Sequence, residues 1–230
     1  MVPVTDRWGG APVPRSPGPR STQVRVGLDL GKINDYTALV ITEEEYREGV
    51  SHFLTRHIER LELGTTYPMV ADRVAQRIGD LDTMRRERKA KALPGFSVEL
   101  VMDTTGIGVA VADLLRERRL RPTLVTLTGS DRVVEHEDGS VSVGKTALVS
   151  RLQVLLQAGR LHLPEMPESD ILTAELATYA IVVNDHANAS FNARSGQHDD
   201  LVISLGLSVG FGGPRKHGAP VVMGSARGRW

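Results

Sequence analysis

The sequence predicts an α/β domain built on a mixed β-sheet, and three observations support this fold class. Three β-rich runs come first, at residues 24–30, 36–42 and 51–63, with only short turns between them. Helical and strand-like segments then alternate as far as residue 163. An apolar helical pattern closes the patterned region at about residues 198–210.

The first three runs are expected to form an antiparallel meander. The runs VRVGLDL and YTALVIT are rich in β-branched residues and are separated by the short segment Gly31–Asp35. The acidic turn Glu43–Gly49 then leads to the third strand. Three neighbouring antiparallel strands are therefore predicted at the start of the domain.

A long helix and a β-α-β unit are predicted next. Apolar residues at Val70, Val74 and Ile78 have helical spacing, which indicates a helix over residues 67–91. The run 97–102 is almost entirely apolar, which favours a strand covered on both faces of the sheet. The remaining elements are a helix at 109–119, a strand at 123–127, a hairpin around Asp138 and Gly139, a helix at 145–157, a strand at 161–163, a helix at 169–180 and the last helix.

Composition narrows the possible functions. The chain of 230 residues has 28 basic and 28 acidic side chains, so its net charge gives no indication of a nucleic-acid partner. The absence of cysteine excludes thiol catalysis, cysteine-based zinc fingers and disulfide scaffolds. The longest apolar stretch, residues 201–211, is too short to cross a membrane. We expect a flexible Pro/Gly-rich leader at 1–23, a folded domain at 24–211 and a basic flexible tail at 212–230.

Two aspartates stand where strands end. Asp29 lies near the end of the first strand, and Asp103 ends the apolar run before Thr104 and the next helix. In α/β sheets, functional sites collect at the carboxyl ends of strands. Each carboxylate also has an ordinary structural alternative, which is a turn role for Asp29 and a helix-capping role for Asp103.

A third acidic group opens the last helix. His198, Asp199 and Asp200 precede an apolar helical run, and acids there can simply interact with the helix dipole. Adjacent helical positions point about 100° apart, so only one of the two aspartates can aim directly at a point shared with Asp29 and Asp103. If the acids converge, their oxygens favour Mg²⁺ or Mn²⁺, and two such ions support phosphodiester hydrolysis.

Four segments, in order, resemble the nuclease domain of the terminase large subunit of tailed phages. They are VRVGLDLGKINDYTALVI, VELVMDTTGIGVAVADLL, VGKTALVSRLQVLLQAGRLHLP and SFNARSGQHDDLVISLGL. The resemblance implies a ribonuclease H-like fold and a divalent-metal-dependent endonuclease that cuts double-stranded DNA during viral genome packaging. It makes Asp29, Asp103 and Asp200 the metal-binding catalytic acids, with Asp199 beside them.

The resemblance also implies supporting residues, partners and a location. Asp35 matches a position that is often acidic and would assist the metal ligands, while His198 would orient a carboxylate or contact DNA. The implied partners are double-stranded DNA, a packaging ATPase, the portal and the small terminase subunit, in the cytoplasm of a host bacterium. A whole large subunit also carries an N-terminal ATPase domain, for which these 230 residues have no room.

Basic side chains in three places are candidate DNA contacts, although each has the alternative of a solvated helix face. No base-reading motif is present, so we expect contacts with phosphates. The candidates are Arg85, Arg86, Arg88, Lys89, Arg118, Arg119, Arg215 and Lys216.

Other functions remain as alternatives. A Holliday-junction resolvase uses a similar acid cluster on the same core, and a DNA-docking module without catalysis would keep the fold. The segment Gly27–Gly31 also resembles the first phosphate motif of actin-like ATPases, but those proteins need two such domains. Finally, residues 139–146 match the phosphate-loop pattern GxxxxGKT, yet an acidic rather than apolar run precedes Gly139. We therefore predict that this segment is structural and that Lys145 begins an amphipathic helix.

Overall fold

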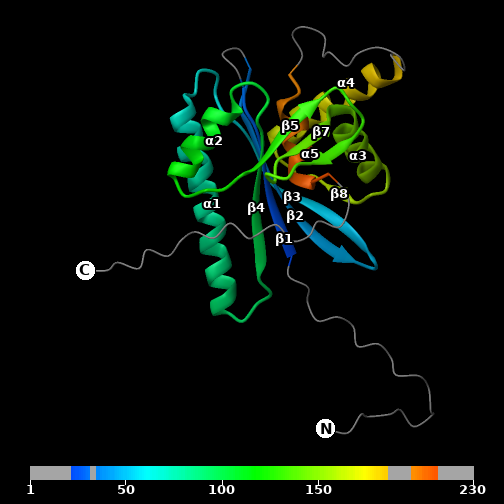
Figure 1. The fold of residues 1–230 in the computed structure, drawn as a ribbon. Coiled ribbons are helices and arrows are strands. Elements are labelled where there is room, and N and C mark those ends of the chain that lie inside the picture. The colour runs from blue at the N-terminus through cyan, green and yellow to red at the C-terminus, as the bar shows by residue number, and fades with distance from the viewer. Residues whose placement is uncertain (1–21, 32–34, 186–197, 212–230) are drawn as a thin grey trace, which may run out of the picture.

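The computed structural model describes residues 22–31, 35–185 and 198–211, and within this part of the chain one mixed sheet forms the centre of the molecule (Figure 1). The predicted leader and tail lie outside the described residues, apart from Thr22 and Gln23, which belong to the first strand. The strands are β1 (Thr22–Asp29), β2 (Ala38–Arg47), β3 (Val50–Arg60), β4 (Phe96–Asp103), β5 (Thr123–Thr128), β6 (Val133–Glu135), β7 (Val141–Gly144) and β8 (Leu161–His162). The helices are α1 (Tyr67–Ala90), α2 (Gly108–Glu117), α3 (Lys145–Gln157), α4 (Pro167–Asp185) and α5 (Asp200–Val209).

The sheet has the strand order β6-β7-β5-β4-β1-β2-β3-β8 and is both antiparallel and parallel. Strands β1, β2 and β3 form the predicted antiparallel meander, and β4, β5 and β7 continue from β1 in parallel. The fold class predicted from the sequence is confirmed. The short strand β6 adds an antiparallel edge, and its turn to β7 at Asp138 and Gly139 is the predicted hairpin. The last helix begins at Asp200 rather than at His198.

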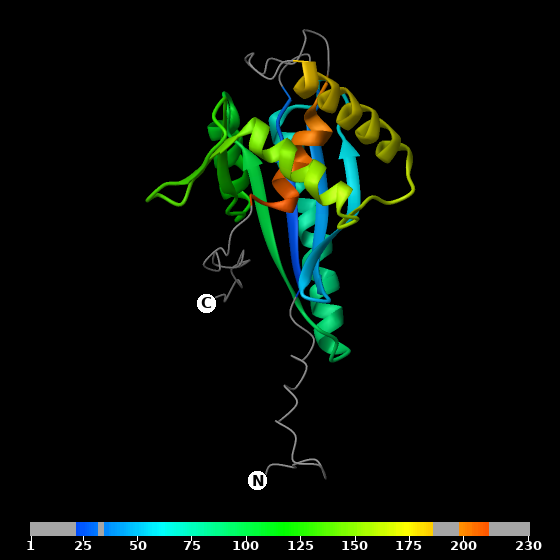
Figure 2. The same ribbon diagram turned by 90° about the vertical axis from the view of Figure 1, so that its right-hand side faces the viewer.

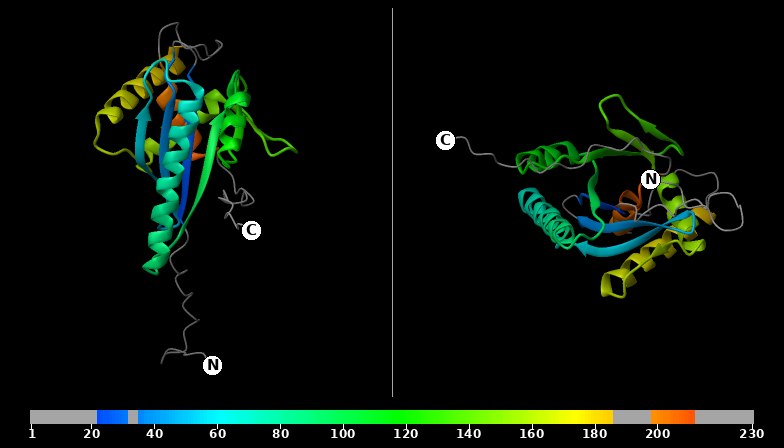
Figure 3. Two further views of the ribbon diagram at one scale, coloured as in Figure 1. Left: turned by 90° about the vertical axis from the view of Figure 1, so that its left-hand side faces the viewer. Right: turned by 90° about the horizontal axis from the view of Figure 1, so that it is seen from below.

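Helices cover both faces of the sheet, which Figure 3 shows from two directions. Helices α1 and α2 pack on one face, where Val74, Val111 and Leu115 meet Val26 and Leu100. Helices α3, α4 and α5 cover the other face. Strand β4 is therefore covered on both sides, as its apolar sequence predicts. None of the helices in the described ranges combines the length and apolarity that a membrane span requires.

Helix α5 lies against the centre of the sheet, and Figure 2 shows it in orange beside the strands. Every residue of this helix is buried, in agreement with its almost wholly apolar sequence. Its two buried serine hydroxyls bond to the sheet: Ser204 Oγ donates to the Ala38 carbonyl at 2.9 Å, and Ser208 Oγ lies 2.7 Å from Thr42 Oγ1. Asp29 N also donates to Ser204 Oγ at 3.2 Å. These bonds hold α5 against β1 and β2.

Gly27 allows this close approach of α5 to β1. A Cβ atom at position 27 would lie 2.0 Å from the Ser204 carbonyl oxygen and 2.8 Å from Ser208 N. We expect Gly27→Ala to lower the free energy of unfolding by about 1 to 3 kcal/mol, because helix backbone must move to relieve the overlap. Urea denaturation measures this change.

Gly79→Ala is the matched control for this substitution. Gly79 lies within α1, and nothing would lie within 4 Å of its new Cβ. The control should be neutral or stabilising by up to about 1 kcal/mol, since alanine favours helix. Equal stability of Gly27→Ala and Gly79→Ala would refute the proposed packing role of Gly27.

Candidate active site

The acidic side chains singled out from the sequence converge at one edge of the sheet. Strands β1 and β4 are parallel with Leu28 opposite Met102, so Asp29 and Asp103 leave the sheet at the same end. Helix α5 begins over this end, with Asp199 at its N-cap and Asp200 as its first residue. Asp29 interacts electrostatically with all three other carboxylates. We call this group of four acids the acid cluster.

Asp29 lies at the centre of the electrostatic interactions of the acid cluster. Burial raises the pKa of Asp29 well above its ordinary value, and the negative charges of Asp103, Asp199 and Asp200 raise it further. The ammonium group of Lys145 opposes this shift. The cluster without bound cations therefore has a strong electrostatic demand for positive charge.

Asp103 is held by the loop that follows β4. Its Oδ1 accepts hydrogen bonds from Thr105 N at 2.8 Å and from Thr105 Oγ1 at 2.6 Å. Thr105 Oγ1 in turn accepts a bond from Leu127 N on β5 at 3.1 Å. Burial raises the pKa of Asp103, whereas the bonds from Thr105 lower it. One oxygen of Asp103 is thus fixed by the loop.

Asp200 is buried at the start of α5, and its two carboxylate oxygens have different surroundings. Arg60 Nε, at the end of β3, donates to Asp200 Oδ2 at 2.8 Å, and the same guanidinium forms an ion pair with Glu175 on α4. Among the residues that the structure describes, Asp200 Oδ1 has no hydrogen-bond partner although it is buried. Burial raises the pKa of Asp200, and Arg60 lowers it. An unsatisfied buried carboxylate oxygen is costly unless a cation or donor binds it.

Asp199 occupies the N-cap position of α5 without making a side-chain capping hydrogen bond. Its Oδ2 instead lies 2.6 Å from Lys145 Nζ, at the first residue of α3. Burial lowers the pKa of Lys145, but the charges of Asp199, Tyr179 and Asp29 outweigh burial, so that the pKa is raised overall. The simple capping role considered for Asp199 is therefore not the role that its side chain has in the structure.

Four residues near the acid cluster were not predicted from the sequence to belong to the site: Lys145, Arg60, Glu175 and Tyr179. Burial raises the pKa of Tyr179 to about 12, and its ring lies 5.9 Å from Lys145 Nζ. Signals for two of them were present, because Arg60 ends the third strand and Lys145 directly follows β7, which is parallel to β5. Nothing in the sequence indicates that Glu175 would pair with Arg60, since these residues meet only through tertiary packing.

The two supporting residues suggested by the resemblance lie in different surroundings. His198 contacts the ring of Tyr36 edge to face, with centroids 5.1 Å apart, and its charge lowers the pKa of Asp200. Arg60 lies over the same Tyr36 ring at 4.8 Å. Asp35 is exposed just before this tyrosine. His198 is thus near the acid cluster, because it contacts the Tyr36 ring on which Arg60 also lies. Among the described residues, Asp35 has no recorded contact with the acid cluster.

The segment that resembles a phosphate loop is part of the sheet. Gly139 forms the turn between β6 and β7, and Val141–Gly144 pairs with β5 on one side and β6 on the other. Backbone N–H groups of a paired strand cannot form a phosphate cradle. Helix α3 begins at Lys145 and buries Leu148 and Leu152, as predicted. Residues 141–144 therefore form a strand rather than a phosphate loop, while Lys145 itself pairs with Asp199 of the acid cluster.

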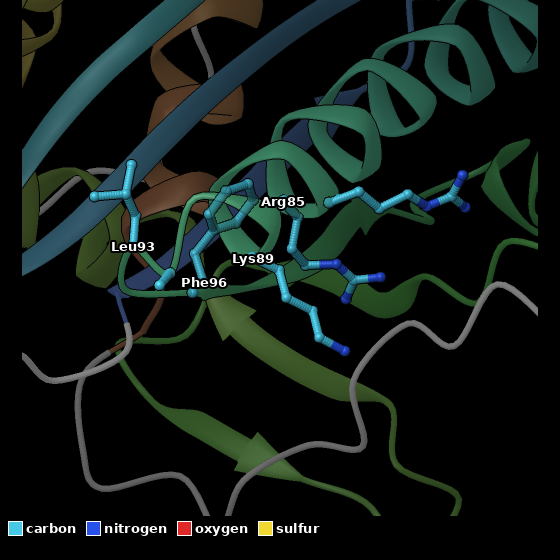
Figure 4. Close-up of a pocket in the computed structure, with 7 residues that line it drawn as sticks. Arg85, Lys89, Leu93 and Phe96 are labelled. Carbon is cyan, nitrogen blue, oxygen red and sulfur yellow. The ribbon is translucent and has the colours of Figure 1, made fainter.

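The candidate DNA-binding side chains on α1 are at the other end of the domain. Residues Arg85, Arg86, Lys89, Leu93 and Phe96 line most of a pocket of about 580 Å³, part of which Figure 4 shows. This pocket lies at the start of β4, and the acids lie at its end, roughly 25 Å away along an eight-residue strand. The α1 patch therefore does not border the acid cluster.

Most of the described candidate arginines also have partners within the domain. Arg85 and Arg86 both pair with Asp82, and Arg118 pairs with Asp72 at 2.7 Å. Arg88 donates to the Pro94 carbonyl at 2.8 Å, and Arg119 follows the end of α2 with a positive φ of 62°. Arg215 and Lys216 lie outside the described residues. Contact of these side chains with DNA stays a prediction.

The residues present suit a hard divalent cation, but the cluster is not arranged as a finished metal site. Within the described ranges, no three His, Asp or Glu side chains are grouped so as to hold an ion. The available donors are all carboxylate oxygens, which favour Mg²⁺ or Mn²⁺, and the buried Asp200 Oδ1 lacks a partner. Lys145 and Arg60 each occupy one carboxylate oxygen of the cluster, on Asp199 and Asp200.

The architecture is the ribonuclease H-like fold of terminase nuclease domains. The nuclease domain of the human cytomegalovirus terminase, soaked with manganese and bound to an inhibitor, matches with a TM-score of 0.52 at 12% identity over 81% of each chain. Another structure of that domain matches with a TM-score of 0.50 at 13% identity over 82% of each chain. No family profile and no curated protein sequence matches this chain. At these identities the likeness establishes the fold, while the phage origin suggested by the resemblance stays a prediction.

Glu175 is expected to make the stability of the metal-free protein depend on pH, and the direction of this dependence can be derived. Burial, with the nearby charge of Asp200, raises the pKa of Glu175 from 4.5 to about 7 despite Arg60. Between these values the folded protein holds a proton that the unfolded chain has lost, so the contribution of Glu175 to stability falls as pH rises from about 4.5 to about 7. We expect the stability difference between wild type and Glu175→Gln to change over this window by at most about 3 kcal/mol.

Urea denaturation of metal-stripped protein at several pH values measures this difference. Glu165→Gln, on an exposed side chain just before α4, is the matched control and should show no such trend. A wild-type minus Glu175→Gln difference that is flat, or that grows with pH, would contradict the assignment.

Proposed function

We propose that this protein is a divalent-metal-dependent endonuclease that cuts double-stranded DNA during viral genome packaging. The observation that carries the proposal is the meeting of Asp29, Asp103 and Asp200 at one edge of a ribonuclease H-like sheet. Each acid arrives from a different element, and helix-capping roles do not account for the set. The manganese-soaked terminase nuclease domain with the same fold supports the same class of chemistry.

The metal ligands in this proposal are Asp29, Asp103 and Asp200. Asp29 interacts electrostatically with both other acids, Asp103 would bind through the carboxylate that Thr105 holds, and Asp200 would bind through its unpaired Oδ1. Two bound Mg²⁺ or Mn²⁺ ions supply activation of a water molecule and stabilisation of the leaving oxygen. Arg60 holds the carboxylate of Asp200, and Thr105 holds that of Asp103. Asp199 keeps its ion pair with Lys145.

The proposal extends to partners and location. Packaging requires a motor, so the partners are double-stranded DNA, a packaging ATPase, the portal and the small terminase subunit. The location is the cytoplasm of the infected host bacterium. DNA contacts are expected mainly with phosphates, because no base-reading motif is present in the sequence.

Plasmid cleavage tests the proposal. Purified protein should nick or linearise supercoiled plasmid with Mn²⁺, and excess chelator should abolish the reaction. Cleavage that persists in chelator would refute metal dependence. Strong preference for a four-way junction over linear duplex would favour the resolvase alternative, and binding without cleavage would favour a docking module.

A further inference from the structure

Two positively charged side chains reach the acid cluster, and they are held very differently. Arg60 lies between Asp200, Glu175 and the Tyr36 ring, and only 16% of its side chain is exposed. Lys145 forms an ion pair with Asp199 and lies 5.9 Å from the Tyr179 ring, and 27% of its side chain is exposed. The Arg60 guanidinium is thus fixed on three sides, while the Lys145 ammonium sits on a flexible stem with fewer restraints.

The two cations also act on different sets of acids. The charge of Lys145 acts on Asp29 and Asp103 as well as on its partner Asp199. It therefore supplies positive charge to three of the four acids. Arg60 instead binds one oxygen of Asp200 and leaves Oδ1 of the same carboxylate unpaired. One cation neutralises the acids, and the other orients a single acid.

We propose that these two residues influence divalent-metal binding in opposite directions. Lys145 is a built-in countercharge that opposes the metal ion electrostatically at the acid cluster, and Arg60 is a positioning residue that holds Asp200 ready to bind it. This inference rests on the proposed function, because it requires Mn²⁺ or Mg²⁺ to bind at Asp29, Asp103 and Asp200.

The expected effects of Lys145 and Arg60 on metal affinity have different physical reasons. Removing the Lys145 charge takes one repulsive cation away from an incoming divalent ion, which increases metal affinity. Removing Arg60 leaves Asp200 without the group that fixes its rotamer, and loss of such an outer partner lowers metal affinity. Asp200 is only 6% exposed, so without Arg60 its charge would also be buried without a partner.

Titration of Mn²⁺ into metal-stripped protein, followed by the electron paramagnetic resonance signal of free Mn²⁺, tests the inference without an activity assay. We expect Lys145→Gln to lower the Kd for Mn²⁺ roughly five- to tenfold. We expect Arg60→Gln to raise it about tenfold or more. Urea melts in chelator establish that each variant is folded before titration.

Conservative variants separate charge from general damage to the site. Lys145→Arg keeps the charge and should stay within about twofold of wild type. The double variant Lys145→Gln with Asp199→Asn removes both members of an ion pair and should return the Kd to within about threefold of wild type. If Arg60→Gln does not fold, Glu175→Gln loosens Arg60 from its other side and should raise the Kd severalfold.

The outcomes distinguish this inference from the proposed function. Opposite shifts for Lys145→Gln and for the Arg60 or Glu175 variants support it. Shifts of the same sign, or a Kd unchanged by Lys145→Gln, overturn it while leaving the metal site intact. Wild-type protein without saturable Mn²⁺ binding, or with binding that Asp29→Asn leaves unchanged, overturns the proposed metal site and this inference together.

Discussion

Asp29→Asn is expected to reduce Mn²⁺-dependent plasmid cleavage by about a thousandfold or more. Asp29 is the residue whose charge acts on Asp103, Asp199 and Asp200 together, so its carboxylate is placed to be shared between metal ions. Metal ions contribute several kcal/mol of transition-state stabilisation, and about 4 kcal/mol corresponds to a thousandfold in rate. Single-turnover cleavage of supercoiled plasmid, with product separated on agarose, measures the effect.

Asp138→Asn is the matched control for this substitution. Asp138 is exposed at the β6–β7 turn, where its Oδ1 accepts bonds from Ser140 N at 2.9 Å and Ser140 Oγ at 2.7 Å. Asparagine can keep these turn bonds, so cleavage should stay within about twofold of wild type. Asp29→Asn protein that cleaves at the wild-type rate would show that Asp29 is not a catalytic acid.

Much of the fold could be predicted from the sequence because its hydrophobic patterns are local. The meander, the apolar strand β4 and the helix at Lys145 follow from alternation, apolar runs and helical spacing. Register and close packing could not be predicted in this way. The pairing of Leu28 with Met102, and the approach of α5 to Gly27, depend on residues more than 70 positions apart in the chain.

The acids of the candidate site could be singled out from the sequence, but their counterions could not. Strand ends and helix starts are recognisable in a sequence, so Asp29, Asp103 and Asp200 could be proposed to meet at the carboxyl ends of strands in a mixed sheet. The pairing of Arg60 with Glu175 and Asp200 joins β3, α4 and α5, and no local pattern encodes it. The basic side chains along α1 lie away from the acid cluster, and two of them pair with Asp82, so their contact with DNA stays a prediction.

Mn²⁺ is expected to raise the melting temperature of the protein, and neutral variants of the acids are expected to reduce this increase. A ligand that binds only the native state stabilises it by about 2.7 kcal/mol at a hundredfold excess over Kd. For a chain of this size that corresponds to roughly 5 to 10 °C. Asp29→Asn, Asp103→Asn and Asp200→Asn each remove a ligand charge, so each should give a smaller increment in a thermal melt.

The same melts in chelator separate loss of a ligand from loss of structure. Asp29→Asn removes a charge that repels Asp103, Asp199 and Asp200, so its metal-free melting temperature should rise above that of wild type. Asp200→Asn should lower it, because Arg60 then loses one of its two carboxylate partners. Asp138→Asn should leave both melts unchanged. If the three site variants keep the full Mn²⁺ increment, these residues are not the metal ligands and the ion binds elsewhere on the protein.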